Sequence, residues 1–397
     1  MSLHINYITG YAGTGKSHTL QEQLTNLPPE TTIVVAPTHK ALYRLSPQSS
    51  EHTFKTIHSL LGWIPRVNEK ATHPAYIQSI HKLDKPLDSY TNIVIDEAGM
   101  MSEDMLLTIV SKIEEAHDYN IKDTVTLTLY LDPYQLLPVK GIQIQTDPDT
   151  TTNLTTQYRS EAPDIVKTYT KFVHYLEGIN TKDLTIPYST NIKPLDITKF
   201  KEGDRLLAYT NRAVGRWNKI IAQHLNITSY IHQEVQMGNM LDPVTVDSFI
   251  QLTYKEILEA YETNTLILQN SKIGKQYIES SLKQLLHHKD IQFIQDINNY
   301  IYPVIVGIDN AHEIRQRAAE KAIKSKPLFR HVYTLNRAFT MDYSFASTVH
   351  KAQGSEFSTV FIDKEDIKQS IRNNYYNTYA RLMYVALSRA INHIYLK

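Results

Sequence analysis

The sequence predicts an α/β protein with parallel sheets, because short apolar runs alternate with helical patterns and a glycine-rich loop follows the first run. The runs are rich in β-branched residues, as strands buried on both faces are. In the N-terminal half they lie at 5–9, 32–35, 93–95 and 125–129. In the C-terminal half they lie at 205–209, 360–362 and 394–396. Helical patterns between the runs, such as 105–116, predict sheets covered on both faces.

The bulk composition is that of a water-soluble protein of several domains. The chain has 397 residues and 42% hydrophobic content, which is enough for two or three packed domains. It has no cysteine, which excludes disulfides and cysteine-ligated metal sites and fits a reducing compartment. It shows neither a signal-peptide pattern nor an apolar run long enough to span a membrane. We therefore expect a cytoplasmic protein without a membrane partner, in the cytoplasm of the host cell if the source is viral.

The net charge of zero bears on possible nucleic-acid partners. Nucleic-acid-binding domains often carry an overall basic bias, and this chain has 41 basic and 41 acidic residues. A protein that must bind and release a strand at every step needs only a local positive groove. The composition therefore weighs mildly against nucleic-acid binding and does not exclude it.

The predicted domain boundaries follow the two series of strands. The ranges are 1–160 for the first domain and 161–230 with 336–397 for the second. A small insertion is expected at 62–90, where Pro65, Pro74 and Pro86 favour a loop or hairpin over a long helix. The segment 231–335 mixes short strand-like pieces with helical stretches, so we expect it to be a domain inserted into the second.

The strongest motif is the glycine-rich loop at 10–17, with the sequence GYAGTGKS. It fits the phosphate-binding pattern GxxxxGK[ST], and a strand precedes it and a helix follows it, as that pattern requires. Glycines let backbone N–H groups wrap phosphates, and the helix N-terminus favours negative charge. Lys16 would reach the β- and γ-phosphates, and Ser17 would bind Mg²⁺. The flanking strand and helix argue against a glycine-rich turn without a ligand.

A pair of acids ends the predicted strand at 93–95. Asp96 and Glu97 would lie at the carboxyl end of a parallel strand, where ligands bind in open α/β sheets. Asp96 is placed to hold the Mg²⁺ shell, and Glu97 to orient or deprotonate the attacking water. A strand that ends in Asp-Glu is common by chance, but the upstream phosphate-binding loop favours the catalytic interpretation.

Gln135, in the turn after the strand at 125–129, is open to two interpretations. Its side-chain amide could detect a γ-phosphate and pass that information to neighbouring loops. From the residues alone, a turn glutamine without a catalytic role is the simpler interpretation.

Together these segments resemble a superfamily 1 DNA helicase of the RecD/Dda-like branch, the group associated with 5′-to-3′ movement. The resemblance spans nearly the whole chain in the family's order. The matching segments are motif Ia at 36–41, Ib at 56–61, II at 96–98, III at 132–139, IV at 154–159, V at 347–357 and VI at 384–390. The Gln-Gly-Ser of motif V, residues 353–355, favours this branch over the branch of opposite polarity. The compact size and composition suggest a phage enzyme.

The resemblance implies a fold and a set of site residues. The fold is two RecA-like P-loop domains with ATP between them, a small wedge at 62–90 and an SH3-like insertion at 231–335. The implied catalytic residues are Lys16, Glu97, Gln135 and the arginine fingers Arg159 and Arg389. The implied magnesium ligands are Ser17 and Asp96. The implied nucleotide-binding residues are Gly10, Ala12, Gly13, Thr14, Gly15, Lys16, Ser17, His18, Gly354 and Glu356.

The resemblance also implies residues that contact single-stranded DNA. These are Pro37, Thr38, His39, Thr56, His58, Trp63, Asn211, Thr348, His350 and Lys351. Hydroxyl and imidazole groups suit contacts to phosphate and sugar, which position a strand without selecting its sequence. Trp63 could stack on a base, and packing in the core explains this residue equally well.

The function that follows is an ATP-dependent helicase that moves along single-stranded DNA, 5′ to 3′, and unwinds duplex DNA. Its cofactors would be ATP and Mg²⁺, and its substrates single-stranded DNA and junctions of single-stranded and duplex DNA. Candidate protein partners are a single-stranded-DNA-binding protein and other proteins of DNA replication or recombination.

Two alternatives stay open, and a departure from the family keeps the second in view. The first is a superfamily 1 RNA helicase, which contacts to the 2′-OH would distinguish. The second is a nucleotide-gated DNA-binding or remodelling protein that does not unwind. Related enzymes carry an adenine-recognising glutamine before the first strand, whereas none of the nine residues before Gly10 is glutamine. We therefore expect other contacts to the base, or use of other nucleotides. A P-loop kinase is disfavoured because it would not need motifs V and VI.

Overall fold

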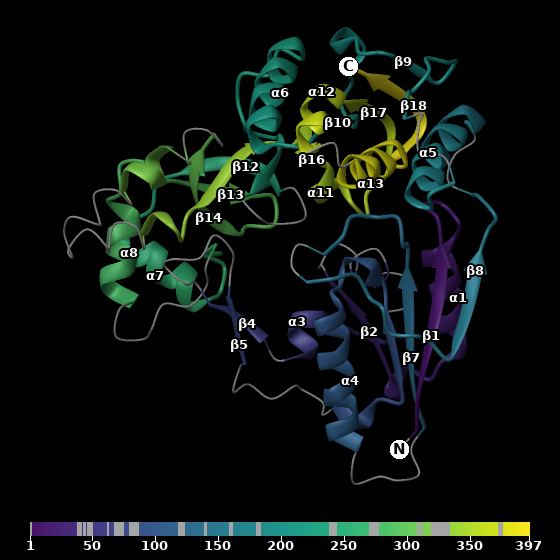
Figure 1. Ribbon diagram of the computed structural model, residues 1–397. Helices are drawn as coiled ribbons and strands as arrows, with labels where there is room; N and C mark the ends of the chain where they lie inside the picture. Colours follow the sequence, from purple (N-terminus) through teal and green to yellow (C-terminus); the bar gives the residue numbers. More distant parts are fainter. Residues whose placement is uncertain are drawn as a thin grey trace. The chain divides into compact units, whose positions relative to one another are not determined.

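The computed structural model divides into two compact units (Figure 1). The first unit comprises Met1–Leu195 and Val349–Lys397, and the second comprises Asp196–Thr348. The structure describes residues 2–37, 42, 45, 51–61, 63–66, 75–78, 87–117, 124–138, 141–158, 162–179, 184–237, 244–269, 278–307, 311, 313–318, 334–371 and 376–397, with only the backbone of 63–66 and 75–78. No helix within these ranges is long and apolar enough to cross a membrane.

In the described part of the first unit, six strands form a parallel sheet in the order β3-β2-β6-β7-β1-β8. Their bounds are β1 Ser2–Gly10, β2 Thr32–Ala36, β3 Thr53–Thr56, β6 Asn92–Ile95, β7 Thr124–Leu131 and β8 Thr150–Leu154. The short elements around them are η1 Pro29–Thr31, α3 Ile57–Leu60, η3 Leu87–Ser89 and η4 Ala98–Met100. The predicted parallel α/β organisation is confirmed here.

Helices α1 (Lys16–Asn26) and α4 (Glu103–His117) cover opposite faces of this sheet (Figure 1). Successive side chains of a strand point to opposite faces. Ile93 and Ile95 of β6 accordingly share a core with Leu106 of α4, whereas Val94 packs with Leu20 of α1. Burying one such side chain contributes about 1.5–3 kcal/mol. The two cores therefore hold the carboxyl ends of the strands in fixed positions.

Strand β1 is longer than the apolar run at 5–9 predicted, because polar residues extend it. It lies between β7 and β8, and it pairs with both along most of its length. In the added part, the hydroxyl of Ser2 donates a 3.2 Å hydrogen bond to the hydroxyl of Thr124, its partner in β7. Polar pairing of this kind leaves no trace in an apolar pattern, so the predicted strand was too short.

The C-terminal part of the first unit is a second group of parallel strands with helices. Strand β18 pairs with β17 and with β9, in both cases in parallel. The bounds are α5 Pro163–Leu176, β9 Ile192–Pro194, α11 Val349–Ala352, β17 Phe357–Ile362, α12 Lys364–Ile367, η8 Lys368–Ser370, α13 Asn377–Leu387 and β18 Ala390–Leu396. Helix α13 is almost entirely buried and packs on α5, with the rings of Tyr379 and Phe172 edge to face at 6.2 Å.

The second unit combines a parallel strand pair with a barrel. Strand β10 pairs in parallel with β16, and α6 follows β10. Among the described residues of this unit, β11 to β15 close into a five-stranded barrel with Val235, Ile294 and Met341 in its core. The bounds are η5 Ile197–Lys199, β10 Arg205–Ala208, α6 Asn211–His224, β11 Glu234–Met237, β12 Val244–Ile250, α7 Tyr254–Glu262, α8 Ile278–Leu286, β13 Gln292–Asp296, β14 Ile301–Val306, β15 Phe339–Tyr343 and β16 Ala346–Thr348.

The described residues of the two predicted insertions include several strands. At 62–90, β4 (Trp63–Arg66) and β5 (Ala75–Gln78) pair antiparallel as a hairpin. The barrel strands extend from Glu234 of β11 to Tyr343 of β15, and β15 pairs with both β11 and β14. The wedge role, the SH3-like assignment and the domain boundaries stay predictions.

Candidate active site

The glycine-rich loop connects β1 to α1 with backbone conformations that need glycine. Gly13 and Gly15 have φ angles of 84° and 85°, in the left-handed region that other residues rarely adopt. At Gly10, a Cβ atom would lie 2.8 Å from the carbonyl oxygen of Leu154, so the first glycine is needed for close approach of the next strand. Thr14 is buried, and its hydroxyl donates a 2.9 Å hydrogen bond to the carbonyl of Tyr11 within the loop.

Both polar groups of the Ala12 peptide are held by side chains from distant segments. Its N–H donates to the phenolic oxygen of Tyr384 in α13, at 2.6 Å. Its carbonyl accepts a 2.8 Å hydrogen bond from the side-chain nitrogen of Gln157, which follows β8. The loop is therefore fixed from two sides and not only by its own strand and helix.

The ammonium group of Lys16 lies inside the curve of the loop. Its Nζ donates to the carbonyl oxygens of Gly10 at 2.6 Å and of Tyr11 at 2.8 Å. It also lies 3.9 Å from a carboxylate oxygen of the buried Asp132. Lys16 is thus held at the mouth of the loop, where the P-loop pattern needs a positive charge.

Asp96 and Glu97 follow β6 as predicted. Asp96 is 6% exposed, its N–H donates to the carbonyl of Val35, and one carboxylate oxygen accepts a 2.9 Å hydrogen bond from the N–H of Glu97. Glu97 has a φ of 51°, an unusual value for a residue with a side chain, and one that costs about 1–2 kcal/mol. The chain therefore turns sharply at the strand end and presents both acids to the same cavity.

The loop after β7 is held by residues that the sequence did not single out. Asp132 accepts hydrogen bonds from the Tyr384 hydroxyl at 2.6 Å and from the N–H of Tyr134 at 3.0 Å. Arg381 donates from Nη1 to the carbonyl oxygens of Pro133 and Gln135, both at 2.7 Å. Burial lowers the pKa of Arg381 and raises that of Tyr384, whose phenol also faces the negative charge of Asp132.

Arg389 follows α13 and is 1% exposed. Its Nε donates to the carbonyl of Val385 at 3.2 Å, its Nη1 to the carbonyl of Ser355 at 3.2 Å, and its Nη2 to the hydroxyl of Ser388 at 3.0 Å. Such a network fixes a planar guanidinium in one orientation. The group lies in the wall of the cavity that the glycine-rich loop also lines.

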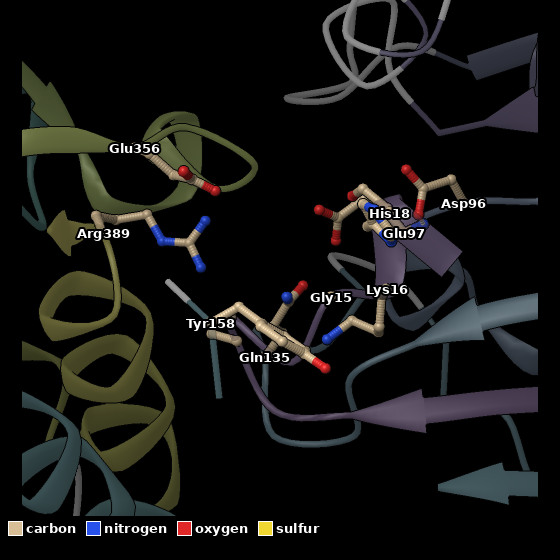
Figure 2. A pocket seen from close by; sticks show the side chains of 12 residues that line it. Gly15, Lys16, His18, Asp96, Glu97, Gln135, Tyr158, Glu356 and Arg389 are labelled. Atoms are coloured by element: carbon tan, nitrogen blue, oxygen red, sulfur yellow. Dashed lines mark hydrogen bonds between the residues drawn. The ribbon is translucent and has the colours of Figure 1, made fainter. Parts of the chain in front are cut away.

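These side chains enclose one cavity of about 190 Å³ within the first unit. Figure 2 shows Glu356 and Arg389 on one side of it and Lys16, Asp96 and Glu97 on the other. The lining residues are Ala12, Gly13, Gly15, Lys16, Ser17, His18, Asp96, Glu97, Gln135, Tyr158, Glu356 and Arg389. Two cations and three acids around one cavity suit a polyphosphate that carries a divalent metal ion.

Tyr158 is the one lining residue that the sequence did not predict. Its N–H donates a 2.8 Å hydrogen bond to the carbonyl of Gly13, its ring lies beside Gly15, and its side chain is 72% exposed. Tyr158 directly precedes the predicted finger Arg159 in the sequence, and this adjacency could have identified Tyr158 as a site residue. Arg159, Thr38, His39 and the side chain of Trp63 lie outside the described residues. Gly10, Thr14 and Gly354 do not line the cavity, and the first two shape the loop instead.

The predicted DNA-contacting residues of the first unit lie on several of its elements. Pro37 follows β2, and Thr56 ends β3 and accepts a 3.2 Å hydrogen bond from the N–H of Ser59 as the cap of α3. His58 lies in α3, and burial lowers its pKa, which favours the neutral imidazole. His350 and Lys351 lie in α11, and burial lowers the pKa of Lys351.

In the second unit, Asn211 and Thr348 lie at one edge of the strand pair. Thr348 ends β16 and is paired with Ala208 at the end of β10, and Asn211 begins α6 just beyond. The carboxyl ends of adjacent parallel strands meet at one edge, so the structure brings these two residues to the same side of the second unit.

Comparisons with known proteins match both ends of the chain. Residues 2–140 match the family model of an AAA domain, and residues 343–396 match that of a UvrD-like helicase C-terminal domain. No curated protein matches the sequence.

Solved structures match over nearly the whole chain. The Pif1 helicase from Candida albicans is 15% identical with a TM-score of 0.53, over 99% of this chain and 90% of that one. The Pif1 helicase from Bacteroides in complex with ADP-AlF3 and ssDNA is 14% identical with a TM-score of 0.50, over 99% of this chain and 88% of that one. At such identities the likeness shows the fold, which is that of two RecA-like domains.

Proposed function

We propose that this chain is a superfamily 1 DNA helicase that hydrolyses ATP, moves 5′ to 3′ along single-stranded DNA and unwinds the duplex ahead of it. Its family follows from an AAA domain and a UvrD-like helicase C-terminal domain in that order, on a fold shared with Pif1 helicases. Within the superfamily we assign it to the RecD/Dda-like branch, on the Gln-Gly-Ser at 353–355 and the fold. The polarity follows from that branch.

The observation that carries the proposal is the position of Arg389 in the wall of the cavity that Lys16 also lines. A lysine in the glycine-rich loop would hold the β- and γ-phosphates, and an arginine in the opposite wall would stabilise charge on the transferring phosphoryl group. Arg159 would supply the second finger. Arg389 follows α13 in the C-terminal segment. A bound nucleotide would therefore contact both the N-terminal glycine-rich loop and the C-terminal segment.

The donor set fits a magnesium ion beside the phosphates. The Ser17 hydroxyl and the Asp96 carboxylate both line the cavity, and Mg²⁺ prefers such hard oxygen ligands. Such an ion would supply positive charge that neutralises the phosphates. Glu97 would take a proton from the attacking water, and Gln135 would contact the γ-phosphate. Lys16 would exchange the carbonyl oxygens of Gly10 and Tyr11 for phosphate oxygens.

Tyr158 would bind the nucleotide base. Its exposed ring borders the cavity beside Gly15. Ring stacking contributes about 0.5–1.5 kcal/mol and does not select strongly among bases. A stacking tyrosine would therefore hold the base with modest selectivity for adenine.

Single-stranded DNA would contact the predicted residues of each unit. Thr56 and His58 of the first unit and Asn211 and Thr348 of the second offer neutral groups to phosphate and sugar. Neutral contacts let the strand be released at each step. A Bacteroides Pif1 structure with the same fold was solved bound to ssDNA. The protein would also bind junctions of single-stranded and duplex DNA. Its protein partner would be a single-stranded-DNA-binding protein or another replication protein.

The test is ATP hydrolysis with and without single-stranded DNA, followed by strand displacement. We expect DNA to stimulate hydrolysis and Lys16→Ala to abolish it. Displacement should then occur from a substrate with a 5′ overhang and not from the matched 3′ overhang. Stimulation by RNA of the same sequence as strongly as by DNA would favour an RNA helicase. Stimulated hydrolysis without displacement from either substrate would overturn the unwinding claim.

A further inference from the structure

Gln135 and Gln353 form a buried pair of side-chain amides. Gln135 is 5% exposed and Gln353 is 8% exposed. The side-chain nitrogen of Gln353 donates a 2.7 Å hydrogen bond to the side-chain oxygen of Gln135. Gln135 lines the cavity, whereas Gln353 follows α11 and does not (Figure 2).

The bond decides which end of the Gln135 amide faces the cavity. A glutamine amide has one acceptor end and one donor end, and rotation by half a turn exchanges them. Because its oxygen is occupied by Gln353, the nitrogen of Gln135 is the end left for a ligand. In the part of the chain that the structure describes, this nitrogen donates to no protein acceptor.

The backbone of Gln135 is held independently of this pair. Arg381 donates to the Gln135 carbonyl at 2.7 Å, and the Gln135 N–H donates to the carbonyl of Asp132 at 3.4 Å. With the main chain fixed, rotation of the amide is the remaining freedom that alters what the cavity presents. In the structure, the hydrogen bond from Gln353 sets the orientation of this amide.

We propose that Gln353 is a positioning residue, which keeps the amide of Gln135 turned with its N–H₂ group toward the γ-phosphate. This inference rests on the proposed function, in which Gln135 contacts that phosphate. Donors aimed at developing negative charge accelerate a reaction, whereas a carbonyl oxygen in the same place repels the phosphate oxygens. Hydrolysis would therefore depend on a residue that touches neither nucleotide nor magnesium.

The test compares two substitutions that remove the donor in different ways. Gln353→Glu introduces a carboxylate that only accepts hydrogen bonds, so Gln135 should turn its nitrogen toward residue 353 and its oxygen toward the phosphate. Gln353→Met removes the donor without imposing the opposite orientation. We expect kcat for ATP to fall roughly 100-fold for the glutamate variant, the scale of losing one catalytic donor. The methionine variant should lie between it and the wild type, and the affinity for ADP should be unchanged in both.

The dependence on pH separates positioning from packing. A protonated carboxyl group donates as the amide does, so Gln353→Glu should approach wild-type kcat near pH 6 and lose it as the pH rises toward about 9, since buried glutamate titrates in this range. An ionised, buried glutamate also disturbs packing in a pH-dependent way, so urea unfolding of each variant is measured at the same pH values. A positioning role lowers kcat even where the variant is fully folded, whereas with a packing role kcat falls only as the folded fraction falls. The control is Gln251→Glu, the same change at an exposed position of the second unit.

The outcomes distinguish this inference from the proposed function. A wild type that does not hydrolyse ATP would overturn the proposed function itself. A wild type that hydrolyses ATP, beside a Gln353→Glu variant of equal kcat across this pH range, would overturn the positioning role alone. If the glutamate variant loses ADP binding, the test rests on Gln353→Met. A methionine variant whose kcat equals that of the wild type would then contradict the inference.

Discussion

The hydroxyl of Tyr384 donates a 2.6 Å hydrogen bond to the buried carboxylate of Asp132 and accepts one of equal length from the N–H of Ala12. One phenolic oxygen thus joins α13, the loop after β7 and the glycine-rich loop. The ring itself packs edge to face on Tyr134 at 6.5 Å and on Tyr169 at 5.8 Å. The hydroxyl of Tyr384 therefore makes the hydrogen bonds, whereas its ring makes the packing contacts. Substitution by phenylalanine removes only the hydroxyl oxygen and separates the two contributions.

Tyr384→Phe should lower the free energy of unfolding by about 1–3 kcal/mol, because two buried polar groups lose their partner while the ring contacts stay. The KM for ATP should rise as the loop loses an anchor. Urea unfolding followed by ATPase kinetics measures both. The matched control is Tyr395→Phe, whose ring stacks on Phe361 at 4.7 Å and whose hydroxyl has no hydrogen bond among the described residues. Equal effects of the two substitutions would contradict the prediction.

Arg389→Lys should lower kcat by about 10³-fold or more with a smaller change in KM, since an ammonium cannot reproduce the fork that three acceptors hold in the cavity wall. Steady-state ATPase assays check this. Arg216→Lys changes an exposed arginine of α6 in the second unit and should leave kcat unchanged. A fall of less than tenfold in the Arg389 variant would argue against a finger.

Tyr158→Ala should raise the KM for ATP roughly 2–10-fold, which corresponds to the loss of one stacking contact, and leave kcat nearly unchanged. Tyr158→Phe keeps the ring and should behave as the wild type. Because the side chain is exposed, neither change should alter the unfolding midpoint. If the phenylalanine variant were as weak as the alanine variant, the hydroxyl and not the ring would be the nucleotide contact.

Glu97→Asn should stabilise the protein by about 0.5–1 kcal/mol and abolish hydrolysis. Asparagine tolerates a φ of 51° better than glutamate does, and the water would lose its base. Glu97→Gln serves as the comparison, because it removes the charge without easing the backbone. Thermal unfolding of the three proteins should rank asparagine highest, with both variants inactive. A destabilised asparagine variant would show that the glutamate side chain also supports the fold.

The phosphate-binding loop and the acid pair could be predicted from the sequence because their chemistry is local. Lys16 and Ser17 belong to one short pattern, and Asp96 and Glu97 directly follow an apolar strand. Their meeting in one cavity follows from parallel strands that end at the same edge. Each of these four residues could therefore be identified from the residues next to it in the sequence.

The supporting side chains could not be predicted, because their partners lie far away in the sequence. Arg381 resembles any helical arginine until its contacts with Pro133 and Gln135 are seen. Tyr384 and Gln353 resemble core and loop residues in the same way. The same limit applies to the strands of the barrel. The sequence of β15, FTMDY, does not identify it as a strand, whereas its pairing with neighbouring strands such as β14 does.

The anchoring of Ala12 by Gln157 and Tyr384 has a consequence for how the protein is made. During synthesis, Ala12 is translated 372 residues before Tyr384. Until then the loop lacks the hydrogen bond from Ala12 to Tyr384, and Arg389 has not been translated. If Arg389 is the finger that we propose, a chain without the segment that carries it should not hydrolyse ATP.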